Sequence, residues 1–290
     1  MINKRRILIA VLLSTIRIHG KIALFTGIGP GAYSTENKLG NFKLTQPTTQ
    51  TTCHTTSLFK TQPAPFFAFM CGGTLEAHKN AFVSGLITGG LLPYGRACFT
   101  TKEYCSSSPA VSINPAQFNG HFFISAYGSG GLNFPITDTF AIQPSLGYGL
   151  NSEYLNVCTL TTPTLFGRFT RQFVGPFATL AGTYQRSALT ASLGYQCMMG
   201  TIQNSLTYPH LHTQLLVTIP GIMNSVNAII TYAVTNAIAL SLNISYGNLS
   251  NYKRGRVTTL INNIVQNNNA YAAHYFIKSF ATYIQATLLY

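Results

Sequence analysis

Charged residues are scarce in this chain of 290 residues. Only 8% of them are Asp, Glu, Lys or Arg, against about 25% in ordinary soluble domains. Five residues are acidic, and none of these follows Glu153. The apolar fraction is nevertheless an ordinary 46%, because Thr, Ser, Asn, Gln and Gly replace the missing charge. Such a composition suits a chain with one face against lipid and the other against water.

The chain also lacks a basic face, although its net charge is +13. Its bases are scattered, apart from Lys4 to Arg6 and the Lys253 to Arg256 segment. Recognition of nucleic acid needs Lys and Arg gathered on one surface. The sequence therefore argues against nucleic acid as a partner.

The cysteines show no metal-binding spacing. There is no Cys-x-x-Cys pair, and the spacing of the six cysteines resembles no zinc site. An exported protein meets an oxidising compartment, where an even number of cysteines permits pairing in many ways. Cys98 and Cys105, in the stretch CFTTKEYC, are the candidates for one small disulfide-closed loop.

The first twenty residues have the pattern of a secretory signal peptide. Three basic residues, Lys4 to Arg6, precede an apolar run over residues 7–16 and a small residue, Gly20. The run is too short to cross a bilayer. We expect cleavage near Gly20, which leaves residues 21–290 as one domain. The alternative is a buried strand or helix end with basic residues by chance.

Two similar stretches lie ninety-eight residues apart. Residues 134–149 read FPITDTFAIQPSLGYG, and residues 232–247 read YAVTNAIALSLNISYG. In both, apolar residues alternate with small or polar ones, which is the period of a strand with different solvents on its two faces. Thr-Asp and Thr-Asn favour turns through Asx capping. Each stretch therefore predicts a strand, a tight turn and a strand.

The alternation favours a transmembrane barrel over two other architectures. Residues 187–252 contain no charge, but a membrane helix there would spread its Asn residues over all faces. A soluble sandwich would place charge on its outer face, whereas here the polar face is almost uncharged. In a barrel the apolar set faces lipid, the polar set faces the lumen, and closure removes the strand edges.

The C-terminal residues carry a resemblance to a known class. Phe280, Ile284, Leu288 and Tyr290 lie at alternate-residue spacing and end the chain on an aromatic residue. This resembles the terminal strand of bacterial outer-membrane β-barrels, and the Thr-Asp turn resembles those of opacity-type and small porin-like barrels. The resemblance implies a bilayer containing lipopolysaccharide, recognition by the outer-membrane assembly machinery, and location in the bacterial outer membrane.

The predicted fold is all-β, an antiparallel up-and-down transmembrane barrel of about 12 strands, within a range of 8–14. Segments 35–63, 93–118 and 251–269 are expected to be outer loops. Thr137-Asp138 and Thr235-Asn236 are expected to be short turns at the opposite, periplasmic end.

Parity predicts which residues face lipid and which face the lumen. The expected lipid-facing residues are Ile142, Leu146, Ile230, Leu240 and Leu242. The candidates for lining a pore are Arg168, Gln143, Ser145, Asn156, Thr231, Ser241 and Asn243.

No motif predicts catalysis, a metal or a cofactor. His210 and His212 lie on one side of a predicted strand but lack further ligands. GIGPGAY, residues 27–33, has phosphate-loop glycines without the following Lys. Glu103 or Glu153 could pair with His121 or His54, but no pattern favours either pair. The chain is therefore not expected to be an enzyme.

Two functions remain. The first is a passive channel for small polar or anionic solutes, with Arg168 supplying positive potential in the lumen. The second is a structural or adhesin-like barrel with a plugged lumen, in which the outer loops make the contacts.

Overall fold

The computed structural model describes residues 21–45, 52–78, 80–105, 108–159, 165–208, 213–262, 264–266 and 271–290. The predicted signal peptide, residues 1–20, lies outside this part of the chain, as do His210 and His212. Within it, no helix is long and apolar enough to cross a membrane.

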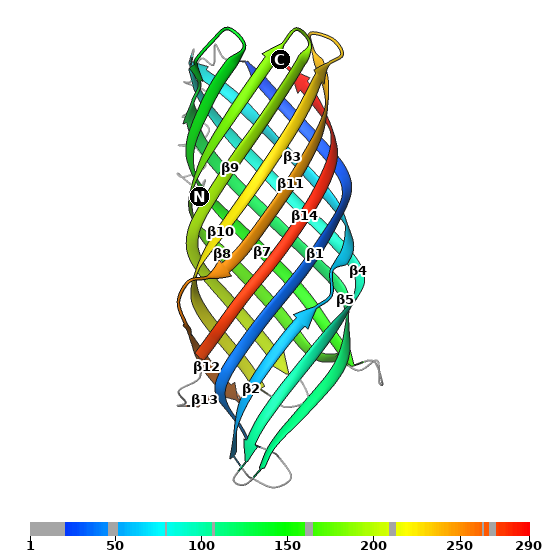
Figure 1. Ribbon diagram of the computed structural model, residues 1–290, viewed down its shortest axis with the longest axis vertical. Helices are drawn as coiled ribbons and strands as arrows, with labels where there is room; N and C mark the ends of the chain where they lie inside the picture. Colours follow the sequence, from blue (N-terminus) through cyan, green and yellow to red (C-terminus); the bar gives the residue numbers. More distant parts are fainter. Residues whose placement is uncertain are drawn as a thin grey trace, which may run out of the picture.

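The strands form one closed antiparallel barrel (Figure 1). Ten positions make up the ring in the described part of the chain, in the order β1, β3, β4, β5, β7, β8, β9, β10, β11 and β14, and β14 pairs with β1. The all-β, up-and-down barrel is thus confirmed, and its strand number lies within the expected range. The bounds are β1 Ile22–Thr45, β2 Thr52–Thr61, β3 Ala64–His78, β4 Ala81–Cys105, β5 Ser108–Leu132, β6 Phe134–Pro135, β7 Phe140–Thr159, β8 Leu165–Arg186, β9 Leu189–Tyr208, β10 Thr213–Ala233, β11 Ile238–Asn251, β12 Gly255–Ile261, β13 Ile264–Gln266 and β14 Tyr271–Leu289.

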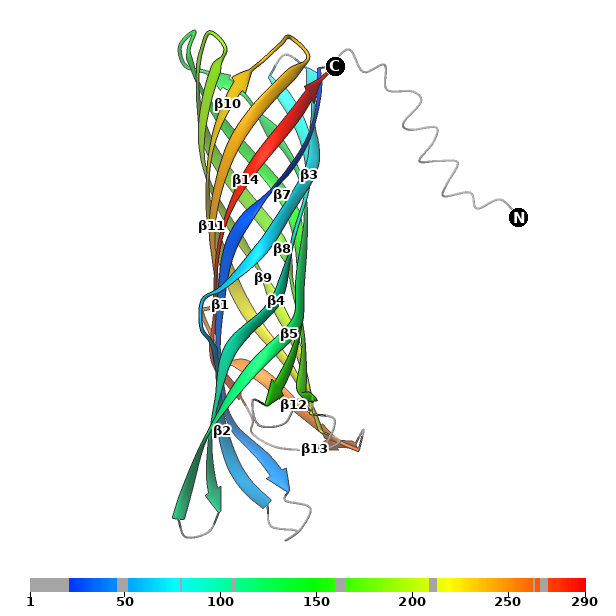
Figure 2. The same ribbon diagram turned by 90° about the vertical axis from the view of Figure 1, so that its right-hand side faces the viewer.

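Short strands complete the ring at the end opposite the short turns. β2 continues the line of β3 between β1 and β4, and β12 continues the line of β11 beside β10. The segments 35–63 and 93–118, expected to be loops, are therefore largely strand. Figure 2 shows β1 with β2, and β4 with β5, extending beyond the rest of the barrel.

The two repeated stretches fold into equivalent turns. Thr137 Oγ1 accepts a hydrogen bond of 3.0 Å from the backbone N–H of Phe140, and Thr235 Oγ1 accepts one of 3.0 Å from Ile238. Both turns lie at the end where Ile22 pairs with Tyr290. Thr, and not the neighbouring Asp or Asn that the sequence suggested, caps the turn in each case.

The side of the strand that carries the apolar residues changes along each long strand. On β9, Leu193, Tyr195 and Met199 point outward and are at least half exposed, while Ile202 and Leu206 point inward and are buried. Most inward positions before this change are small or polar, such as Gln196, with Met198 as the apolar exception, and the outward positions after it, such as Gln203, are polar. Inward and outward parity itself continues unbroken through the strand.

This change divides the barrel into two halves. We call the part next to the short turns the membrane half (residues 189–200 on β9) and the remainder the projecting half (201–208 on β9). The membrane half presents an apolar belt to the outside, as a lipid-facing barrel requires. The projecting half is apolar inside and polar outside, as a barrel in water requires.

Candidate functional site

A cluster of charged and polar side chains lies inside the barrel where the two halves meet. Glu153 on β7 accepts a charge-assisted hydrogen bond from Arg171 on β8, its partner in the strand register. Tyr33 on β1 donates its hydroxyl to the same carboxylate, and His121 Nε2 lies 2.8 Å from Glu153 Oε1. Arg171 also donates to Thr35 Oγ1 at 3.3 Å. Four strands therefore converge on one carboxylate.

Aromatic rings enclose this cluster. The Arg171 guanidinium lies 4.3 Å from the centroid of the Tyr275 ring, and the Tyr33 and His121 rings meet edge to face at 4.8 Å. The side chains of His121 and Arg171 are 0% and 7% exposed. A buried ion pair with this number of partners keeps both charges solvated by protein groups, and the removal of one partner would leave the other charge unpaired.

A bulge on β5 brings His121 to the cluster. The register between β5 and β7 shifts between Asn119 and Phe122, and Gly120 has φ +64°. Glycine adopts this left-handed conformation at little cost. Ala116 points inward before the bulge and His121 points inward after it, so the bulge changes inward positions from even to odd.

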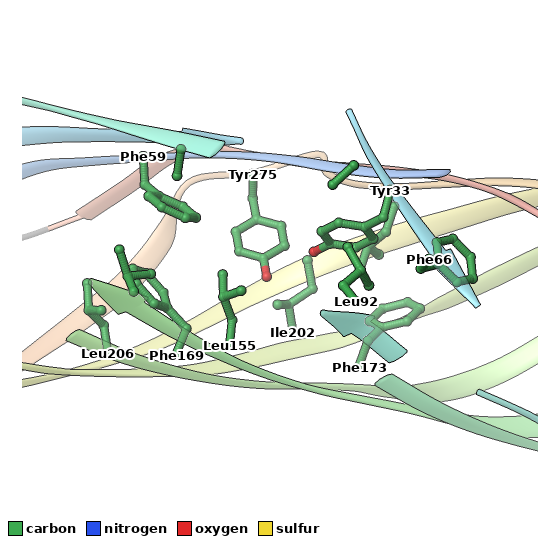
Figure 3. Packing of buried hydrophobic residues seen from close by; sticks show 14 of the residues in the cluster. Tyr33, Phe59, Phe66, Leu92, Leu155, Phe169, Phe173, Ile202, Leu206 and Tyr275 are labelled. Atoms are coloured by element: carbon green, nitrogen blue, oxygen red, sulfur yellow. The ribbon is translucent and has the colours of Figure 1, made fainter. Parts of the chain in front are cut away.

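Beyond the cluster, the interior of the projecting half is filled with side chains. Phe59 and Phe169 stack with ring centroids 4.8 Å apart, and Figure 3 shows Phe59, Tyr275 and Tyr33 meeting Phe169 and Leu155 from the opposite wall. Every ring position contributes an inward residue that is at most 7% exposed, as follows: Tyr33, Phe59, Leu92, Ala116, Leu155, Phe173, Ile202, Val217, Leu249 and Tyr275. We call this layer the seal.

On the other side of the seal, the membrane half contains a cavity of about 420 Å³. Its lining includes Phe25, Phe66 and Met70 from β1 and β3, and Gln196 and Asn243 from β9 and β11. Glu153 and Arg171 line the end of the cavity that is next to the seal, and they also contact the seal.

The structure places five of the predicted pore-lining residues on the inner face. Thr231 and Ser241 are register partners whose hydroxyl oxygens lie 2.8 Å apart. Gln143 accepts a hydrogen bond of 3.5 Å from Thr183, on the neighbouring strand. Ser145 shares the inward parity of Gln143, and Asn243 is buried against Met70. Whether these residues line a conducting pore stays a prediction.

Arg168 and Asn156 are corrected. The prediction assumed a turn near residue 154, but β7 runs unbroken from Phe140 to Thr159. Even positions therefore remain outward through Asn156, and its register partner Arg168 is exposed on the outer face, 5.6 Å from the centroid of the Tyr154 ring. Arg171 is the arginine that points inward.

The predicted lipid-facing residues and the terminal residues lie on the outer face of the membrane half. Leu146, Ile230, Leu240 and Leu242 are 71%, 53%, 50% and 43% exposed, and Ile142 shares their parity. The C-terminal residues Phe280, Ile284, Leu288 and Tyr290 are likewise exposed. Placement of these residues agrees with the prediction, whereas their roles stay predictions.

The predicted disulfide does not fit the structure. Cys98 is a free thiol, and Cys105 lies seven residues further along the same extended strand, β4. At about 3.3 Å per residue, the two Cα atoms are far beyond the roughly 7 Å that a disulfide can span. The segment was expected to be a loop, and its pairing with β5 makes it a strand instead.

Comparisons with known proteins identify the fold. The sequence matches no family model and no curated protein. The outer membrane protease OmpT from Escherichia coli is similar in structure, with a TM-score of 0.69 at 9% identity over 94% of this chain and 98% of that chain. The translocator domain of autotransporter NalP from Neisseria meningitidis and the Pseudomonas putida toluene transporter TodX give TM-scores of 0.37 and 0.27, at 8% identity each, over 98% and 92% of this chain and 94% and 89% of those chains.

The likeness to OmpT supports the outer-membrane barrel class, while the opacity type in particular is not supported. It also corrects one expectation. The chain was not expected to be an enzyme, but a protease shares its fold over nearly the whole length of both chains. The fold therefore gives no support to that expectation, and at 9% identity it does not transfer the protease activity either.

Sequence reasoning named Glu153 and His121 as one possible pair but missed Arg171 and Tyr33. A signal was present for Arg171. If β7 and β8 are taken as the two strands of one hairpin, the register that pairs Phe140 with Tyr184 also pairs Glu153 with Arg171. Division of this hairpin into three strands hid the pairing.

Proposed function

We propose that this protein is a non-conducting outer-membrane barrel that presents its projecting half as a rigid surface outside the cell. The observation that carries the proposal is the seal, to which every position of the ring contributes a buried side chain. A water-filled channel would leave some inward positions at this level exposed to solvent.

The passive channel has less support. Its anion preference depended on Arg168, which lies on the outer face. Its open path would need to cross the seal, where Phe173 and Ile202 are fully buried. The adhesin-like alternative requires only that the projecting half be rigid and exposed.

The outer face of the projecting half favours an anionic partner. Lys60, Arg96, Arg168 and Arg256 point outward there, and Glu36, which lies 3.2 Å from Lys60, is the acidic neighbour. Phosphate groups of lipopolysaccharide supply the matching charge at this level. Attraction to exposed cations weakens with salt, so binding to anionic lipid should fall as ionic strength rises.

Residence in the outer membrane is part of the proposal. Removal of residues 1–20 by a signal peptidase and insertion by the assembly machinery, which would read Phe280 to Tyr290, are its first steps. Mass spectrometry of the protein from an outer-membrane fraction should find a mature N-terminus close to residue 21. Intact Met1 in a cytosolic fraction would contradict export.

Conductance across a planar bilayer tests the seal directly. The purified, refolded protein should give no stepwise current. A Phe59→Ala, Phe169→Ala double variant removes a ring of the seal and the ring stacked on it, and it should admit a small current. The matched control is Phe67→Ala, Phe122→Ala, which removes two exposed rings from the outer face. Steady single-channel steps from the unmodified protein would reject the proposal and favour the channel.

A further inference from the structure

The cavity in the membrane half has two chemically different walls. Five of its seven aromatic lining residues lie on β1, β3 and β5, namely Phe25, Tyr33, Phe66, Phe123 and Tyr127. All six lining amides lie on β7 to β14, namely Asn151, Gln196, Asn227, Asn243, Asn248 and Gln285. One wall can therefore contact a ring by its face or edge, and the wall formed by the other strands can form hydrogen bonds.

Two amides of the polar wall have buried oxygens that lack a donor. Within the described ranges, neither Asn243 Oδ1 nor Gln285 Oε1 has a hydrogen-bond partner, and these residues are 6% and 7% exposed. Asn243 pairs with Tyr283 and Gln285 pairs with Ser241, so the two amides are diagonal neighbours on the inner face. An unmade hydrogen bond at a buried acceptor is costly, so a ligand donor would be stabilised by either oxygen once the amide turns it towards the cavity.

The cavity offers no net charge to a ligand. Glu153 and Arg171 are the charged residues in its described lining, and they bind each other. A ligand carboxylate or ammonium would enter without a counter-ion and would compete with that pair. The volume of about 420 Å³ lies within the range of small-molecule sites, about 300–1,000 Å³.

We propose that the cavity is a binding site for an uncharged aromatic molecule that carries hydrogen-bond donors at one edge. Its ring contacts the wall formed by Phe25, Phe66 and Phe123, and its donor groups bind the oxygens of Asn243 and Gln285. Because the seal closes the outward side, the ligand enters from the end with the short turns, past the inner face of Gln143, Thr231 and Ser241. The site does not depend on the outer surface of the projecting half.

Equilibrium dialysis of the mature protein in lipid nanodiscs tests the site with three related probes. 2-Naphthamide has the aromatic body and amide donors, naphthalene lacks the donors, and 2-naphthoate carries a charge. Binding is measured against empty nanodiscs to remove partition into lipid. We expect saturable binding of 2-naphthamide at one molecule per barrel, and weaker binding of the other two.

Variants assign the binding to the polar wall. Asn243→Leu and, independently, Gln285→Met should each lower the affinity for 2-naphthamide about tenfold, which is the usual effect of one lost hydrogen bond to a buried group. Gln203→Met is the matched control, because this amide points outward and lies away from the cavity and its entrance, and it should bind normally. Ser245→Phe should abolish binding by filling the cavity. Circular dichroism and thermal unfolding show whether each variant is folded.

Three results would overturn the proposal. 2-Naphthamide that binds no better to the protein than to empty nanodiscs would rule out the site. Equal affinity for naphthalene, with no effect of Asn243→Leu or Gln285→Met in folded protein, would leave only an apolar crevice. Tighter binding of 2-naphthoate would contradict an uncharged ligand. None of these outcomes bears on conductance, so the closed barrel is tested separately.

Discussion

The membrane half and the projecting half are built from the same strands with opposite polarity. On β8, Leu180 and Tyr184 point outward in the membrane half, whereas Phe169 and Phe173 point inward in the projecting half. The backbone parity is the same in both, and only the apolar set changes sides. The solvent outside the barrel determines where apolar side chains are stable, and it changes from lipid to water along each strand.

The interiors differ accordingly. In water, a small barrel needs a packed apolar core for its stability, and the seal provides it. In lipid, apolar residues are already favourable on the outside, so the interior can remain polar and incompletely filled. The cavity is therefore found in the membrane half, and the ion cluster of Glu153 and Arg171 lies between the two.

The largest effect should follow from breaking the ion cluster. Arg171→Met leaves the Glu153 carboxylate buried beside His121 and Tyr33, and we expect a loss of about 3–5 kcal/mol in the free energy of unfolding. Urea unfolding in lipid vesicles measures it. The double variant Arg171→Met, Glu153→Gln removes both charges and should recover most of the loss. A double variant as unstable as the single one would show that packing, and not the unpaired charge, causes the effect.

A truncation in each half should distinguish the packed interior of the projecting half from the cavity. Leu206→Ala removes a side chain that is 2% exposed in the projecting half, and we expect a cost of about 2–5 kcal/mol from lost burial and a new void. Met223→Ala, on the cavity wall, should cost clearly less because its side chain already borders empty space. Equal costs in urea unfolding would contradict the difference in packing between the halves.

Substitution by a larger side chain should give a smaller difference in stability between the two halves, in the same direction. Ala116→Leu adds volume to the packed seal and should cost about 1–3 kcal/mol. Ser245→Leu adds volume beside the cavity and should change the unfolding free energy by less. Thermal unfolding followed by circular dichroism would detect the difference. A cavity variant that is the less stable of the two would argue that the membrane half is the more tightly packed.

The smallest effect is expected for Arg168, on the outer face. Arg168→Glu should leave the unfolding free energy within about 0.5 kcal/mol, as surface changes usually do. If a variant with an opened seal conducts, Arg168→Glu in that variant should also leave the reversal potential unchanged, because the side chain does not reach the lumen. A shift of the reversal potential toward cations would restore Arg168 to the pore.

The change of polarity explains which parts of the fold could be predicted. The alternation of residues 122–150 and 226–246 lies within the membrane half, and there the predicted faces agree with the structure. The predicted breaks near residues 154, 172, 201 and 221 fall where the apolar set changes sides. A change of phase in the pattern has the same appearance as a turn that starts a new strand. The prediction therefore divided the region of β7 and β8 into three strands, and it divided the region of β9 and β10 in the same way.

The candidate site shows the same limit. Glu153 and His121 were recognised as an acid and a possible partner, but their distance depends on the bulge at Gly120 and on the pairing of β5 with β7. Arg171 joins them only once β7 and β8 are taken as one hairpin. No short-range pattern contains this information, because the cluster joins four strands and Tyr33 lies 138 residues before Arg171.

By itself, the sequence determined the barrel class, the outward apolar belt, the two short turns and the alternating terminal strand, since each depends on periodicity within a few residues. The tertiary structure alone decided the ten-strand ring, the outward position of Arg168, the seal and the cavity. These depend on strand length and register, and register is fixed only when all strands close together and each inward side chain meets its partners across the lumen.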